Sequence, residues 1–213
     1  MSDGYQPNPA PNQNPVPPTA DQLIGDATSV LGSFMKDPVG AVRTAWDHKK
    51  IVMALIVAAG FVIVQLLNSI ITGAGNLKFG TILGSWIRLS ITQIALFAIV
   101  ALIGTLLVRG HCTSGYVGAL SGVGAAAVPF LVGFAASTVL SLVERILPFK
   151  IIIWILSTVQ SAIGTPLLIA MFVLLALAIR RKTVNENDYM VARNCVVLAG
   201  VYYAANYLIW LIL

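Results

Sequence analysis

Residues 51–72 read IVMALIVAAGFVIVQLLNSIIT, a continuous apolar stretch without a charged side chain. A helix needs about 20 apolar residues, each rising about 1.5 Å, to cross a hydrocarbon core of roughly 30 Å. Because lipid offers no hydrogen-bond partner, the backbone of such a segment has to bond within itself. The stretch therefore predicts a transmembrane helix.

Four further apolar stretches follow, separated by short polar junctions, and together they predict an all-α, polytopic transmembrane bundle of five spans. Their expected bounds are 89–108, 117–143, 151–179 and 194–213. The composition agrees, with 58% hydrophobic and 10% charged residues, whereas soluble proteins carry roughly 25% charged residues. We assign residues 49–213 to one transmembrane domain.

Arg88 interrupts the second apolar stretch, which begins at Phe79. An arginine in the middle of a bilayer costs about 2.5–3.5 kcal/mol on insertion scales. We therefore expect Arg88 at the outer membrane interface, with residues 79–87 as an interfacial or re-entrant lead-in. The rival interpretation is a functional arginine within the membrane.

Small residues dominate the first half of the third span, where Gly118 and Gly122 are four positions apart. Small side chains let helices approach closely in lipid, so we expect this helix to be central in the bundle. Pro129 is expected to kink it, and Pro166 is expected to kink the fourth span, because proline removes a backbone donor.

Two different segments precede the first span. Residues 1–18 are rich in Pro, Asn and Gln and are expected to be a disordered tether, with a proline-based recognition motif as the alternative. They lack the basic start and apolar region of a signal peptide. Residues 19–48 show apolar positions at three- and four-residue intervals, which predicts amphipathic cytoplasmic or interfacial helices interrupted at Asp37-Pro38.

Trp46, Lys49 and Lys50 directly precede the first span. Indole rings favour the headgroup region and lysines are attracted to anionic lipid. We expect these three residues to anchor the chain at the membrane interface. In the alternative arrangement, the helix at residues 20–35 packs on the cytoplasmic ends of the bundle.

Lysine and arginine are retained on the cytoplasmic side, and this rule gives an orientation. With the N-terminus inside, nine of the 13 basic residues are cytoplasmic and four, Lys78, Arg88, Arg145 and Lys150, are extracytoplasmic. Five spans then place the C-terminus on the extracytoplasmic side. Topology and anionic lipid account for the net charge of +5, so no nucleic-acid partner is expected.

The usual catalytic and cofactor motifs are missing from the sequence. There is no Walker loop, dinucleotide-binding turn, HExxH or nucleophile elbow. His48 and His111 have no third metal ligand nearby. Cys112 and Cys195 are expected on or near the reducing side of the membrane, which argues against a disulfide; neither needs a role, and the alternative for Cys112 is acylation. We predict no enzyme activity, metal or cofactor.

Uncharged polar residues are the remaining candidates inside the membrane. They are Gln65, Asn68, Gln93, Gln160 and Asn206. Such residues stabilise helix packing by interhelical hydrogen bonds, and the alternative is that they line a pore or substrate site. No acidic residue lies in the middle of a span, which weakens the case for a coupled transporter. Glu144 and Arg145 lie at the end of the third span.

The stretch FMKDPVGAVRTAW at residues 34–46, followed by five closely spaced spans, resembles the Yip (Ypt/Rab-interacting protein) membrane domain. The resemblance covers residues 34–213 and includes the Asp37-Pro38 step and the small-residue third span. It implies a protein of the prokaryotic cell membrane, or a trafficking-related one if the source is eukaryotic.

Two functional hypotheses follow. The preferred one is a non-enzymatic scaffold that organises the bilayer or recruits a membrane-protein partner or a second copy of itself. The alternative is a small oligomeric permease or channel subunit, whose solute flux would depend on Arg88, Gln93 and Gln160. An intramembrane enzyme would need clustered carboxylates or a nucleophile–base pair, which the sequence lacks.

Overall fold

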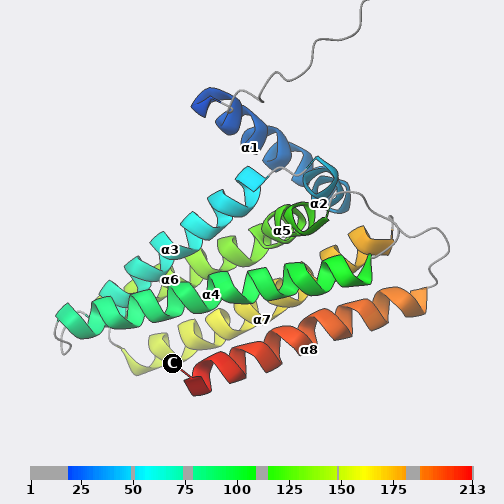
Figure 1. Ribbon diagram of the computed structural model, residues 1–213. Helices are drawn as coiled ribbons and strands as arrows, with labels where there is room; N and C mark the ends of the chain where they lie inside the picture. The colour runs from blue at the N-terminus through cyan, green and yellow to red at the C-terminus, as the bar shows by residue number, and fades with distance from the viewer. Residues whose placement is uncertain are drawn as a thin grey trace, which may run out of the picture.

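The computed structural model describes residues 19–48, 51–73, 79–108, 115–147, 149–180 and 188–212, which form eight helices and no strand (Figure 1). Five helices are long and apolar enough to cross a membrane, which confirms the predicted all-α bundle and its five spans. The chain is therefore an integral membrane protein. The tail at residues 1–18, together with Lys49 and Lys50, lies outside the described residues.

Helices α1 (Ala20–Phe34) and α2 (Pro38–Asp47) are separated at the Asp37-Pro38 step, as predicted. Asp37 is the N-cap of α2, and its Oδ1 accepts a hydrogen bond of 2.9 Å from the backbone N–H of Gly40. A Cβ atom at Gly40 would lie 2.2 Å from Asp37 Oδ2. The glycine therefore leaves room for the carboxylate that caps the helix.

Helices α3 (Ile51–Gly73) and α4 (Phe79–Leu107) form the first two spans. Residues 79–87, expected as an interfacial or re-entrant lead-in, form the first turns of α4, which is one continuous helix through Arg88. The Arg88 side chain is exposed, and its guanidinium donates to a carbonyl in the last turn of α8. A charged side chain with such a partner is compatible with a helix that continues past it.

The third apolar stretch is two helices, α5 (Gly115–Ala126) and α6 (Val128–Ile146), where one span of residues 117–143 was expected. The break falls at Ala127, and Pro129 occupies the first turn of α6, where its missing N–H is not needed. Only α6 is long enough to count as a span. Helix α5 is buried along most of its length and contacts α2, α3 and α4, which confirms its central position.

Helices α7 (Lys150–Arg180) and α8 (Asp188–Ile212) complete the bundle. Helix α7 continues through Pro166, and α8 starts earlier than the expected residue 194. In Figure 1, α1 and α2 lie at one end of the bundle, beside the start of α3, and the C-terminal end of α8 lies at the other end.

The outer faces of the spanning helices carry exposed apolar side chains, which only lipid or another membrane protein would cover. Examples from the five spans are Leu55, Leu102, Val132, Ile155 and Leu208. The buried core lies between the helices and includes residues of α2 as well as of α3, α4, α5, α7 and α8. The N-terminal helix α2 is thus part of the folded bundle.

Candidate functional site

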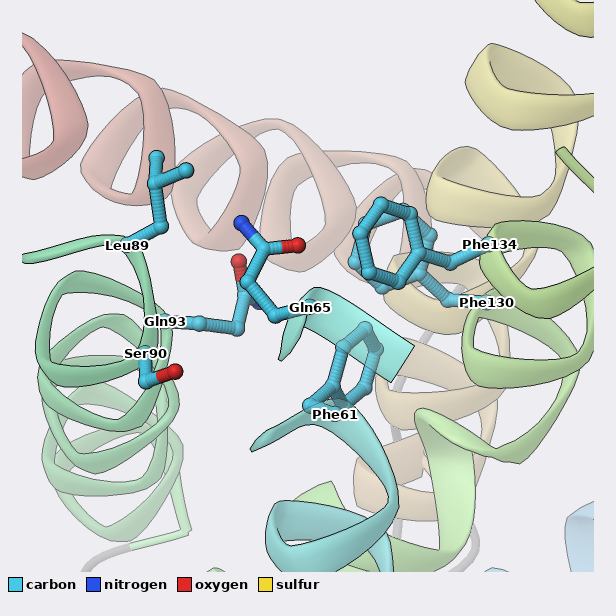
Figure 2. A pocket seen from close by; sticks show the side chains of 7 residues that line it. All are labelled: Phe61, Gln65, Leu89, Ser90, Gln93, Phe130 and Phe134. Atoms are coloured by element: carbon cyan, nitrogen blue, oxygen red, sulfur yellow. The ribbon is translucent and has the colours of Figure 1, made fainter. Parts of the chain in front are cut away.

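A cavity of about 90 Å³ lies among α3, α4 and α6. Gln93 is the central residue of α4 and Gln65 lies well inside α3, so the cavity belongs to the membrane-spanning part of the bundle. Figure 2 shows the two glutamine side chains between Ser90 and Leu89 on one side and three phenylalanine rings on the other. The complete lining is Phe61, Gln65, Leu89, Ser90, Gln93, Phe130 and Phe134.

Polar atoms without hydrogen-bond partners are concentrated in this cavity. Among the described residues, five buried side-chain nitrogen or oxygen atoms lack a partner, and three of them belong to its lining. These three are Gln65 Oε1, Ser90 Oγ and Gln93 Nε2. Each such atom costs about 1–3 kcal/mol when nothing occupies its hydrogen-bonding position.

Gln93 is held in place by its other amide atom. The hydroxyl of Tyr202, in α8, donates a long hydrogen bond of 3.5 Å to Gln93 Oε1, whereas Nε2 has no partner. One turn before Ser90, the indole Nε1 of Trp86 donates to the carbonyl of Val62 at 2.9 Å and joins α4 to α3. The polar groups therefore sit on fixed helices.

The apolar wall consists of packed aromatic rings. The ring centroid of Phe61 is 5.3 Å from that of Phe130 and 5.9 Å from that of Phe134. Phe61 also makes an edge contact with Phe97, with the centroids 5.2 Å apart. Packing of this kind is favourable, and the three rings together form one side of the cavity.

Gln65 and Gln93 were among the residues predicted as candidates inside the membrane, whereas Ser90 and the three phenylalanines were not. A helical-wheel argument would have found Ser90, because residues three apart lie on the same face of a helix. Nothing in the sequence pairs α3 with the first half of α6. Gln160 belongs elsewhere: its Nε2 donates to Ser137 O at 3.2 Å and to Ser141 Oγ at 3.0 Å, joining α7 to α6.

Trp46 does not anchor the chain in the headgroup region, contrary to expectation, because its ring is only 1% exposed and belongs to the core. A Cβ atom at Gly122 would lie 2.5 Å from Trp46 Cε3, and one at Gly104 would lie 3.2 Å from Trp46 Cη2. Glycines of α5 and α4 thus form the pocket that receives the indole ring.

The small residues of α5 also allow a close approach to α3. A Cβ atom at Gly124 would lie 2.5 Å from the Cα atom of Ala54. Gly118 is buried in the same helix. The small residues of α5 therefore allow close packing against α3 and against Trp46.

Two arginines bind free carbonyl groups at the C-terminal ends of neighbouring helices. Arg88 Nη2, in α4, donates to the Trp210 carbonyl at 3.3 Å in the last turn of α8. Arg145, in α6, donates to the Ile71 carbonyl in the last turn of α3. The last carbonyls of a helix have no partner within it and carry partial negative charge, so both contacts are favourable.

These contacts give a structural role to Arg88 and Arg145, whose roles the sequence alone did not decide. Arg88 lies at the level of the end of α8, and its position within α4 needs no catalytic or transport role. Arg145 bonds across to α3, while Oε1 of its neighbour Glu144 has no partner.

The fold and the site define a class: a multi-pass helical membrane protein with a small cavity among α3, α4 and α6 that is lined by polar and aromatic side chains. No group of three or more His, Cys, Asp or Glu that could hold a metal ion occurs in the described part of the chain. The chain matches no protein-family model, no curated protein and no solved structure.

Proposed function

We propose that this chain is a non-enzymatic membrane protein of the Yip type that organises the bilayer or recruits a partner through its N-terminal helices. The observation that carries the proposal is the burial of Trp46 among α2, α4 and α5. A helix that only tethered a soluble tail would not need such a fixed attachment. Through α2, the bundle holds α1 in a defined position at one of its ends.

Helix α1 has the properties of a recognition element. It contacts α2 and α3, and Phe34 at its end packs against the core. Its sequence is amphipathic, and Met35, just beyond it, is 87% exposed. An amphipathic helix of this kind binds a lipid surface or the groove of a partner.

The basic residues support the location of this element. If α1 and α2 face the cytoplasm, the cytoplasmic side carries most of the lysines and arginines. We accordingly propose a cytoplasmic N-terminus, an extracytoplasmic C-terminus and a prokaryotic cell membrane as the location.

The test is replacement of residues 20–33 by a flexible linker of equal length, which keeps Phe34 packed against the core. Deletion of residues 20–47 would not serve, because it removes Trp46 from the core and unfolds the bundle end. We expect the replacement variant to melt as the unmodified chain does and to lose partners that chemical crosslinking captures in native membranes. An unchanged set of crosslinked partners, and unchanged liposome shape on reconstitution, would refute the proposal.

The central cavity favours a second candidate function, a small permease or channel subunit. Of the three residues expected to govern flux, only Gln93 lines the cavity, whereas Arg88 and Gln160 bind other groups. Solute flux into liposomes that falls with Gln93→Leu and survives Gln160→Leu would establish this function in place of the scaffold.

A further inference from the structure

Ser90 is unusual among the hydroxyl side chains of these helices. Thr92, Thr105 and Ser121 donate to the carbonyls four residues earlier, at 2.8–2.9 Å. That bond satisfies a hydroxyl inside an apolar bundle without any outside partner. Ser90 is only 8% exposed and its Oγ makes no such bond, because it points into the cavity.

The other two unpartnered atoms complement each other. Gln65 Oε1 is an acceptor and Gln93 Nε2 is a donor. Both lack partners, so they do not bond to each other across the cavity. A molecule between them would need a donor facing Gln65 and an acceptor facing Gln93.

Charge and size restrict that molecule. No ionisable side chain lines the cavity, so a buried ion would lose its hydration without gaining a counter-charge. The volume of about 90 Å³ equals that of about three water molecules at liquid density. A single neutral molecule with about four non-hydrogen atoms fits this volume.

We propose that the cavity lined by Gln65, Ser90, Gln93, Leu89 and the three phenylalanines is a binding site for a small uncharged primary amide or a close analogue. The NH₂ group of the ligand donates to Gln65 Oε1, and its carbonyl accepts from Gln93 Nε2. Ser90 Oγ provides a third hydrogen bond. The rings of Phe61, Phe130 and Phe134 cover the apolar part. Binding requires no pathway across the membrane, so the site is independent of the scaffold function proposed above.

The experiment uses the full chain in lipid nanodiscs and ligand-observed saturation-transfer NMR with acetamide as the probe. We expect a saturable acetamide signal. Ser90→Ala should weaken binding about fivefold, the loss of one ordinary hydrogen bond. Gln93→Leu should weaken it at least as much. The matched control is Ser121→Ala, which removes a fully buried hydroxyl bonded within its own helix and should leave the signal unchanged.

Two comparison probes define the chemistry. Acetone has the size of acetamide but no N–H donor, so it should bind more weakly than acetamide. Tetramethylammonium tests whether the aromatic rings select a cation. The proposal is overturned by the absence of a saturable acetamide signal, which would mean that the cavity holds water only. It is also overturned if both cavity variants bind like the control, or if tetramethylammonium binds better than acetamide.

Discussion

The indole ring of Trp46 occupies the space that a side chain at Gly122 would need. A Cβ atom there would lie 2.5 Å from Trp46 Cε3, and the ring cannot move aside because it is 1% exposed. The two residues come from α2, which precedes the first span, and α5, which lies between the second and third spans. This contact makes the N-terminal helix part of the membrane domain.

Gly122→Ala is expected to destabilise the protein by about 1–3 kcal/mol, the cost of overpacking a filled core. The measurement is reversible unfolding in detergent micelles. Trp46→Leu should relieve the clash, so the cost of Gly122→Ala should be smaller in the Trp46→Leu background. The matched control is Gly164→Ala, where no neighbouring atom lies within 4 Å. Equal losses from both glycine substitutions would refute the packing argument.

Asp37→Ala should lower stability by about 0.5–2 kcal/mol, because it removes the N-cap of α2. Asp37→Asn retains an acceptor oxygen and should lose much less. Gly40→Ala should act in the same direction as Asp37→Ala, since its methyl group would displace the capping carboxylate. Thermal unfolding of the three variants provides the measurement. A loss of stability in Asp37→Asn as large as that in Asp37→Ala would contradict the capping role.

Arg88→Leu should loosen the end of α8, because the Trp210 carbonyl loses its donor. The expected cost is about 0.5–1.5 kcal/mol, since the site is exposed. Hydrogen exchange of the last-turn amides of α8 should become faster. Arg43→Leu removes another exposed arginine, one that pairs with Asp47 at 3.5 Å, and should leave this exchange unchanged.

Gln160→Leu should weaken the contact between α7 and α6, because two hydrogen bonds to Ser137 and Ser141 are lost. A double-mutant cycle with Ser141→Ala is expected to give a coupling energy of about 0.6–2 kcal/mol, as for other interhelical hydrogen bonds in membranes. A coupling of zero would mean that the pair does not stabilise the bundle.

A reporter fused after residue 213 should be active on the extracytoplasmic face, and one inserted at residue 184 should be active in the cytoplasm. This result follows from five spans with a cytoplasmic N-terminus. Alkaline carbonate should not extract the chain from membranes. Reporter activity on the same side at both positions would invalidate the orientation or the span count.

Several elements were predictable because their causes are local. The stretch at residues 51–72 is apolar and long enough to span, and α3 runs over Ile51–Gly73. Asp37-Pro38 separates two helices, since proline restricts the residue before it. Pro129 marks the region of a helix break for a similar reason, although the break itself falls at Ala127.

Other features depended on contacts between distant segments. The expectation that Trp46 contacts headgroups rested on its place beside the first span, and packing against Gly104 and Gly122 overrode it. Arg88 suggested a helix boundary, but the end of α8 supplies its acceptor.

Five segments long and apolar enough to cross a membrane could be identified without the structure, because length and hydropathy act within each segment, and the described residues form five such helices. Which polar side chains bond across helices and which face a cavity depends on how distant segments pack against one another. The physical reason is that lipid and the bundle interior are equally apolar, so hydropathy does not distinguish them. Gln160 and Gln93 look alike in the sequence, and only their neighbours in space make one a packing contact and the other part of a site.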